Sequence, residues 1–333
     1  MLNKFSKINF SECIGNTPLL KLKLASEISG CNIFGKCEFL NPGGSVKDRP
    51  ARQIILDAIE EKRIKPGGTI VEGTAGNTGI GLSLVGNSLG MNSVIVMPKT
   101  QSDEKKKMLK LCGAKLHLVE AVPYKDPGNY IRYSETLSKE MINPNGVLWA
   151  NQFDNLSNKK SHYLTTGPEI WKQLSGNVDA FICSIGTGGT LAGVGDYLKE
   201  MNKDILIGLA DPFGSAMYNF FKHGKMESTG NSITEGIGQG RITKNLEQIK
   251  IDECFQISDT QALEIVFEMI EKEGLILGGS SGINIIGAIK LGKLMGKNKN
   301  IVTILCDYGT KYESKIFNKE FLKEKRLPIP SWL

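Results

Sequence analysis

The chain has 333 residues, of which 40% are hydrophobic and 23% charged, and its formal net charge is +6. These values are ordinary for a soluble globular protein with one or two domains. No apolar run approaches the roughly 20 residues of a membrane-spanning helix, so we expect no membrane protein. The densest basic run, Lys105–Lys107, is interpreted as a solvated helix face, which argues against a nucleic-acid partner.

The N-terminus and the cysteines indicate a cytoplasmic protein. Met1–Lys7 lacks the apolar segment of a secretory signal. The seven cysteines are scattered and show no C-x-x-C spacing, which predicts reduced, partly buried thiols. The three histidines, His117, His162 and His223, are far apart and have no ligand-like neighbours. We therefore expect no metal site.

The first half of the chain alternates between helical and strand patterns. Ile54, Ile55, Ala58 and Ile59 show helical spacing before the break at Pro66-Gly67-Gly68. The predicted elements here are a helix at 49–62, a strand at 69–73, a helix at 80–89, a strand at 93–97, a helix at 102–112 and a strand at 114–119. This order is typical of a mainly parallel sheet covered by helices on both faces.

The same alternation returns after a polar stretch. The predicted elements are a helix at 164–174, a strand at 178–184, a helix at 191–201, a strand at 205–210, helices at 260–273 and 283–295, and a strand at 300–305. Residues 211–253 are rich in Gly, Ser and Asn and are predicted to be mostly loop. The charged tail 318–333 is interpreted as a surface arm or interface segment. Periodicity thus predicts an α/β protein.

Four motifs in this frame suit one cofactor. Lys47 follows a Gly-Gly turn in Asn41–Arg49, and glycine-bounded loops follow at Thr74–Gly79, Gly186–Thr190 and Gly278–Gly282. A lysine amine can bind an aldehyde covalently, and backbone N–H groups at helix starts can bind a phosphate. Alone, Lys47 would be interpreted as a surface lysine that begins a helix. Together with the loops it predicts a site for pyridoxal 5'-phosphate (PLP).

The loop at 186–190 is the predicted phosphate site. Its residues are Gly186, Thr187, Gly188, Gly189 and Thr190, and they stand between an apolar strand and a helix. Backbone N–H groups at that helix start, together with two hydroxyls, make an anion site without Lys or Arg. The loop is not a Walker A motif, because no Gly-Lys-Ser/Thr ends it.

With Ile14–Leu19 and Cys306–Gly309, these motifs make the chain resemble the cysteine synthase/cystathionine β-synthase family of fold-type II (tryptophan-synthase-β-like) PLP enzymes. The resemblance covers nearly the whole chain. It implies two domains, each a mainly parallel twisted sheet flanked by helices. The smaller domain would span 40–155, and 1–39 with 156–333 would form the larger. It also implies that the cofactor lies in a cleft between them.

The resemblance also implies a role for each motif residue. Lys47 would form the Schiff base and then act as the general base for the substrate α-proton. Asn77 would bind the phenolic oxygen of the cofactor, and Ser280, chosen over Ser281, would bind its pyridine nitrogen. Asp307-Tyr308-Gly309 would lie near the ring, although its sequence departs from the cysteine synthase pattern.

The substrate side is implied in the same way. Its predicted residues are Thr74, Ala75, Gly76, Thr78 and Gln152, which would hold the α-carboxylate, and Gly236, in a flexible segment at the cleft entrance. Ala75 is a departure, because family members commonly have serine at that position. The missing hydroxyl leaves one substrate contact, and hence the choice of substrate, open.

The implied reaction is β-replacement on an O-activated L-serine. The favoured version converts O-acetyl-L-serine and sulfide into L-cysteine and acetate, in a homodimer that the C-terminus of a serine acetyltransferase is able to dock on. Alternatives are a cystathionine β-synthase or a diaminopropionate-type synthase, which use another nucleophile. More distant alternatives are a serine/threonine dehydratase and a catalytically silent PLP-binding protein.

Overall fold

The computed structural model describes residues 9–74 and 76–333, which form two compact units. Unit 1 comprises residues 9–15 and Asn41–Ser161, and unit 2 comprises Asn16–Leu40 and His162–Leu333. The sequence grouped the N-terminal residues with the larger domain. Residues 9–15 instead belong to unit 1, where Ile14 packs in the hydrophobic core with Ile54 and Leu82.

Unit 1 is built on a parallel sheet. Within the described residues its strand order is β5 (Lys115–Val119), β4 (Asn92–Pro98), β3 (Thr69–Gly73) and β6 (Val147–Trp149). Every residue of β3 is buried, as expected for a central parallel strand covered on both faces. The predicted substrate loop at 74–79 therefore follows a strand that is held firmly in the core.

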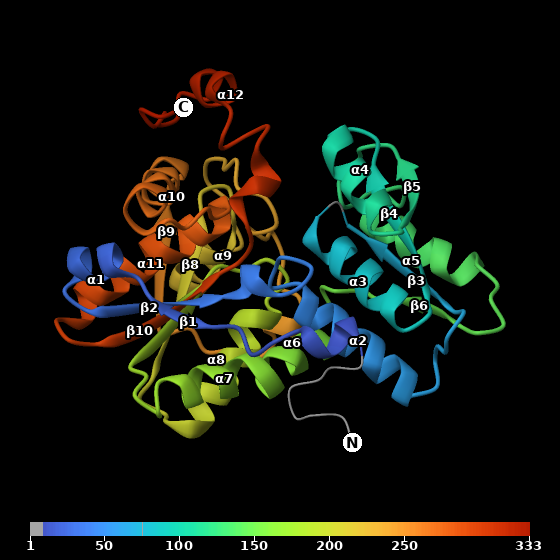
Figure 1. Cartoon of the computed structure of the whole chain (residues 1–333), viewed down its shortest axis with the longest axis horizontal. Helices are drawn as coiled ribbons and strands as arrows, with labels where there is room; N and C mark the ends of the chain where they lie inside the picture. Colours follow the sequence, from blue (N-terminus) through green and yellow to red (C-terminus); the bar gives the residue numbers. More distant parts are fainter. Residues whose placement is uncertain (1–8, 75) are drawn as a thin grey trace. The chain divides into compact units, whose positions relative to one another are not determined.

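Helices cover both faces of this sheet (Figure 1). The helical elements of unit 1 are η1 (Phe10–Cys13), α2 (Asp48–Glu60), α3 (Asn77–Ser88), α4 (Asp103–Leu111), α5 (Tyr130–Glu140) and α6 (Ser157–Ser161). Ile70 of β3 packs with α2 and α3, whereas its neighbour Val71 packs with Tyr130 and Leu137 of α5. The alternation of side chains along a strand thus supplies both cores.

Unit 2 contains the larger sheet. Its strands in the described chain follow the order β1 (Leu19–Lys21), β2 (Asn32–Cys37), β10 (Asn300–Leu305), β7 (Ala180–Cys183), β8 (Leu206–Pro212) and β9 (Glu253–Ile257). β1 is antiparallel to β2, and the other pairs are parallel. The predicted α/β fold with mainly parallel sheets is confirmed.

The helices of unit 2 also lie on both sides of its sheet, with α10 and α11 on one side and α7 and α8 on the other (Figure 1). Its helical elements are α1 (Lys23–Ser29), η2 (Glu38–Leu40), η3 (His162–Thr166), α7 (Gly167–Gln173), α8 (Gly189–Met201), α9 (Met217–His223), η4 (Lys244–Leu246), α10 (Asp259–Glu273), α11 (Gly279–Met295), η5 (Gly309–Tyr312) and α12 (Lys319–Glu324). α10 begins at a capping box between Ser258 and Gln261 and ends at Gly274, whose φ is +69°.

Two predicted segments differ from the structure. Residues 211–253 are mostly irregular, but α9 and η4 lie within them. The tail is more than a surface arm, because Leu322 of α12 is fully buried against Phe267 of α10. Trp332 adds an edge-to-face contact with Phe267, at a distance of 5.9 Å between ring centroids. Packing on α10 therefore holds the end of the chain.

Three further findings concern the described residues only. No helix among them is long and apolar enough to cross a membrane. They contain no cluster of three His, Cys, Asp or Glu side chains placed to hold a metal ion. The cysteines are free thiols, and burial raises the pKa of Cys37 to about 11 and that of Cys254 to about 12.

Candidate active site

Lys47 stands at the end of a tight turn in unit 1, as the N-cap residue of α2. The backbone N–H of Gly43 donates to Asp48 Oδ2 over 2.5 Å, and Asn41 Nδ2 donates to Ser45 O over 3.2 Å. The N–H of Lys47 donates to Ser45 Oγ over 3.2 Å. The carboxylate of Asp48, the first residue of α2, thus ties the turn together. These bonds fix the backbone from which the Lys47 amine projects.

The loop after β3 opens α3, next to this turn. Gly76 is the N-cap of α3 and Asn77 its first residue. A Cβ built on Gly81 of α3 would lie 3.2 Å from Lys47 O, so the starts of α2 and α3 are neighbours. A Cβ at Gly76 would meet nothing within 4 Å, so the space beside its Cα is open. Ala75 lies outside the described residues.

Thr78 and Gln152 are 74 positions apart in sequence but in contact. Thr78 Oγ1 donates to Gln152 Oε1 over 2.6 Å, and both side chains are buried. Gln152 follows Asn151, whose φ of +47° turns the chain back toward β3. Asn158 Nδ2 donates to Gln152 O over 2.8 Å and holds this turn. Two predicted substrate residues therefore lie together at one end of β3.

Gln152 also binds a residue that sequence reasoning missed. Its Nε2 donates to Glu72 Oε1 over 3.2 Å, and Glu72 is 1% exposed. Burial raises the pKa of Glu72 to about 8, against the lowering effect of hydrogen bonds from Gln152 and Asn151. The sequence held a signal for this residue, namely a glutamate within a strand predicted to be buried.

In unit 2 the loop at 186–190 joins β7 to α8. Gly188, with φ +87°, is the N-cap of α8, and the helix begins at Gly189. Thr243 Oγ1 donates to Thr187 O over 2.8 Å. A Cβ at Gly188 would lie 2.3 Å from Leu246 Cγ, so only glycine fits there. The first N–H groups of α8 have no partner within the helix, and this donor set suits a phosphate.

Gly236 lies against this loop, because a Cβ on Gly186 would come within 2.3 Å of Gly236 O. The N–H of Gly238 donates to Ile185 O over 3.0 Å, and both Gly236 and Gly238 have positive φ. The predicted entrance segment therefore packs along the predicted phosphate loop in the same unit.

His162 is a second residue that sequence reasoning passed over. It is buried in the π-helical turn η3, with Nδ1 2.9 Å from Thr166 Oγ1 and Nε2 3.2 Å from Thr190 Oγ1. π-Helical turns occur often at functional sites. The imidazole thus contacts Thr190, the last residue of the 186–190 loop. The two residues are 28 positions apart, so a local sequence pattern could not predict this contact.

The two candidate serines at the start of α11 differ in their surroundings. Ser281 is fully buried, and its Oγ accepts a hydrogen bond from the N–H of Cys306 over 2.9 Å. This bond ties α11 to the end of β10 and gives Ser281 a structural function. The choice of Ser280 as the cofactor residue gains support from this arrangement. Asp307 lies next to the same helix start, 2.3 Å from a Cβ built on Gly278.

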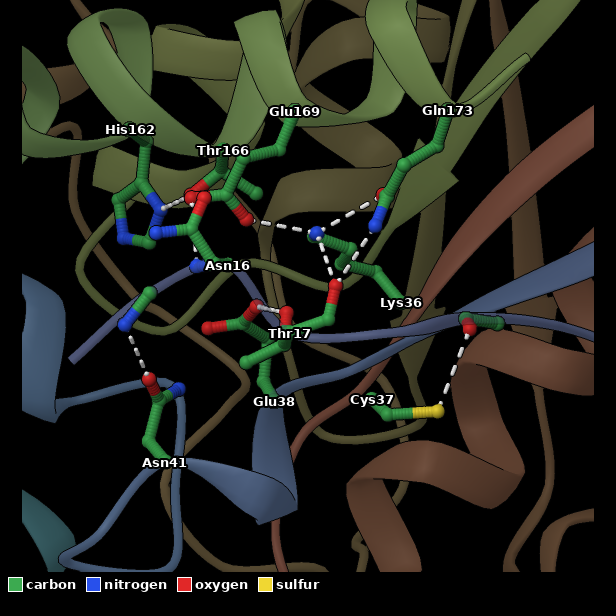
Figure 2. Close-up of polar contacts among 12 residues, drawn as sticks. Asn16, Thr17, Lys36, Cys37, Glu38, Asn41, His162, Thr166, Glu169 and Gln173 are labelled. Carbon is green, nitrogen blue, oxygen red and sulfur yellow. Dashed lines mark hydrogen bonds and ion pairs between the residues drawn. The ribbon is translucent and has the colours of Figure 1, made fainter. Parts of the chain in front are cut away.

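A buried ion pair supports unit 2 near its first strands (Figure 2). Lys36 of β2 has 0% exposure, and its Nζ lies 2.6 Å from Glu169 Oε2 of α7. The same Nζ donates to Thr17 O over 2.7 Å and to Gln173 Oε1 over 3.0 Å. The N–H of Asn16 donates to Glu169 Oε1 over 2.9 Å. Lys36 thereby fixes the Asn16–Thr17 segment of the predicted family motif.

The chain is similar to known proteins along most of its length. The sequence profile of the family described as "Pyridoxal-phosphate dependent enzyme" matches residues 10–307. Cysteine synthase 1 of Neurospora crassa is 48% identical over 319 residues, which cover 94% of this chain and 84% of that protein.

Two solved structures resemble the chain along most of its length. An O-acetylserine dependent cystathionine β-synthase from Helicobacter pylori matches with a TM-score of 0.83 at 31% identity, over 93% of this chain and 98% of that one. An O-ureido-L-serine synthase matches with a TM-score of 0.85 at 30% identity, over 94% and 96%.

Proposed function

The chain belongs to the pyridoxal-phosphate dependent enzyme family, and on that basis we propose that it makes L-cysteine from O-acetyl-L-serine and sulfide, releasing acetate. The observation that carries the proposal is the 48% identity to a cysteine synthase across 94% of the chain. The fold supports it, because each unit places helix N-termini and glycine loops after its parallel strands.

Each unit, taken by itself, holds residues that suit part of the cofactor. The N–H groups of 186–190 at the start of α8 would bind the phosphate, and Lys47 would hold the aldehyde carbon. Asn77 would donate to the phenolic oxygen, and the Ser280 hydroxyl would bond the pyridine nitrogen. When bound, PLP withdraws electrons from the α-carbon of the amino acid, which makes its proton acidic and the β-substituent able to leave.

The remaining steps belong to the side chains of this protein. Thr74, Thr78, Gln152 and the N–H groups from Gly76 onward would hold the α-carboxylate at the start of α3. The Lys47 amine, once exchanged for the substrate amine, would accept the α-proton at Nζ. Acetate leaves from the β-carbon, and sulfide then bonds to that carbon. Gly236 and Gly238 allow the segment beside the phosphate loop to adjust to substrate.

The test combines a lysine variant with a choice of substrates. Purified protein supplied with PLP should show a visible absorbance band that Lys47→Ala removes, and the variant should lose turnover by about 10³-fold or more. Lys110→Ala, which removes an exposed lysine of the same unit, is the matched control. Full turnover in Lys47→Ala would overturn the mechanism.

The substrates then separate the candidate reactions. O-acetyl-L-serine, O-phospho-L-serine and L-serine are each offered with sulfide, and the cysteine formed is measured. Homocysteine is the second nucleophile, because the Helicobacter pylori relative is described as an O-acetylserine dependent cystathionine β-synthase. Faster cystathionine than cysteine formation would favour that second function. Release of ammonia without any nucleophile would indicate a dehydratase and contradict the proposal.

The cellular setting is part of the same proposal. We infer a homodimer in the cytoplasm, since the family implies a dimer and the cysteines are free thiols, as is usual in a reducing compartment. We also propose that the C-terminus of a serine acetyltransferase docks on this dimer. Light scattering with and without a peptide of that C-terminus tests the dimer and the docking together.

A further inference from the structure

Glu72 has an unusual environment for a carboxyl group. It lies near the end of β3, is 1% exposed, and receives hydrogen bonds from amides. Gln152 Nε2 donates to its Oε1 over 3.2 Å, the N–H of Gln152 to its Oε2 over 3.4 Å, and the N–H of Asn151 also donates to it. Glu72 therefore stands directly behind Gln152, on the side away from Thr78.

The side-chain amide of Gln152 connects two groups with different requirements. An ionised carboxylate accepts hydrogen bonds only, so Gln152 turns its nitrogen toward Glu72 and its oxygen toward Thr78. The hydroxyl proton of Thr78 is then donated to Gln152, over 2.6 Å. A protonated Glu72 is able to donate to the amide oxygen instead. The amide then turns over, its nitrogen donates to Thr78 Oγ1, and the Thr78 proton becomes free to donate elsewhere.

We propose that Glu72 is a positioning residue which decides, through Gln152, whether the Thr78 hydroxyl is available to donate to the substrate α-carboxylate. The inference rests on the proposed function, in which Thr78 and Gln152 hold that carboxylate. Glu72 itself acts through Gln152. A neutral Glu72 gives the anionic substrate one more donor and removes a negative charge from behind it.

The surroundings of Glu72 bring its protonation close to working pH. Burial raises the pKa of Glu72 to about 8. The phenol of Tyr130 in α5 is near enough to interact with its charge. Burial, then the charge on Glu72, raise the pKa of that phenol. Tyr130 is therefore neutral at the pH where Glu72 titrates. From β4 the partner residue is Ile95, and the neighbours on the side of β6 are the amides of Asn151 and Gln152. Carboxylate binding should weaken as pH rises through about 8.

The test measures binding in place of turnover. L-Alanine has the amine and carboxylate of the substrate but no β-leaving group, so its dissociation constant can be read from the absorbance of the holoenzyme. Glu72→Gln keeps the size of the side chain and cannot ionise. Above about pH 8 this variant should bind L-alanine about tenfold more tightly than the wild type, the size of one hydrogen bond to a charged group. Below that pH the two proteins should bind alike.

A double-variant cycle separates the hydrogen-bond route from simple charge repulsion. In a Thr78→Val background the advantage of Glu72→Gln at high pH should disappear, because the hydroxyl that Glu72 controls is gone. Thr78→Ser, which restores a hydroxyl, should bring it back. An advantage that persists in Thr78→Val would mean that Glu72 acts by charge alone and would overturn the positioning role.

A matched control comes from the same unit. Asp57 is a buried carboxylate that accepts from Lys160 over 2.8 Å and from Gln53 over 2.7 Å, away from Gln152. Asp57→Asn should leave the pH dependence of L-alanine binding unchanged. An identical pH dependence in the wild type and in Glu72→Gln overturns this inference while the proposed function stands. Absence of any cofactor band overturns the proposed function, and this inference fails with it.

Discussion

Lys36 in unit 2 and Glu72 in unit 1 are both buried ionisable residues, but their hydrogen-bond partners differ. Lys36 is paired with Glu169 at 2.6 Å and donates to two further oxygens. Glu72 receives hydrogen bonds from the amides of Asn151 and Gln152. A paired charge is costly to disturb and serves stability. For Glu72, burial raises the pKa more than the hydrogen bonds from these amides lower it, and so the carboxyl titrates near working pH.

Removal of one partner from the buried pair should have the largest effect on stability. Lys36→Met leaves Glu169 without its cation in a desolvated position, and we expect the free energy of unfolding to fall by about 3–5 kcal/mol. Urea unfolding followed by circular dichroism measures this loss. The double variant Lys36→Met/Glu169→Leu should recover most of it, because two apolar side chains need no partner. A single variant as stable as the wild type would show that the pair contributes little.

Glu72 should make the free energy of unfolding depend on pH. Its pKa is about 8 in the folded protein, above the ordinary value of 4.5, so the folded state holds the proton more tightly than the unfolded state. Its contribution is therefore greatest below pH 4.5 and is lost as pH rises toward about 8. Between these limits the stability of the wild type relative to Glu72→Gln should fall by about 1.4 kcal/mol per pH unit.

The measurement is urea unfolding of both proteins across this pH range, without added cofactor or substrate. Across this range the stability of Asp57→Asn relative to the wild type should not change with pH. Burial, the largest influence on Asp57, acts to raise its pKa, but hydrogen bonds, led by the one from Lys160, outweigh burial and lower the pKa below the ordinary value of 3.8. The contribution of Asp57 is therefore lost only as pH falls below 3.8. A relative stability that does not change with pH would mean that Glu72 is ionised throughout and would weaken the contrast with Lys36.

The smallest effect is expected for an exposed ion pair. Lys139 and Glu135 of α5 are 2.7 Å apart with side chains 72% and 39% exposed. Water screens this pair, so Glu135→Ala should cost only about 0.3–0.5 kcal/mol, and added salt should reduce that cost further. Thermal unfolding at low and high salt measures both. A loss as large as that for Lys36→Met would show that burial is not what separates the two pairs.

Several elements could be predicted to the residue from the sequence. The strands at 69–73 and 300–305 coincide with β3 and β10, because short buried strands are bounded by clear breakers. Three helices begin two or more residues earlier than predicted. α3 starts at Asn77 and not at Ile80, α8 at Gly189 and not at Leu191, and α11 at Gly279 and not at Ile283. In these helices the apolar periodicity starts only after the first turn. Glycines have low helix propensity, so the glycine-rich first turns were not predicted to be helical.

Other elements were not predicted from the sequence. β1, α1, β2, α5, β6 and β9 lie in segments for which the sequence predicted no element. β6 has three residues, and its pairing with β3 is what makes it a strand. A short strand of this kind forms because a neighbouring strand supplies its hydrogen bonds, which is a property of tertiary structure.

The sequence by itself determined the chemistry and the order of its parts: a lysine after a glycine turn, glycine loops at helix starts, and an alternation of strands and helices. These features depend on local backbone rules and on residue type, which neighbouring positions reveal. Only the tertiary structure decided that Thr78 donates to Gln152, that Glu72 stands behind it, that His162 supports Thr190, and that Lys36 is paired with Glu169. Those contacts join residues far apart in the chain, and the burial that shifts the pKa of Glu72 exists only once β3 is covered on both faces.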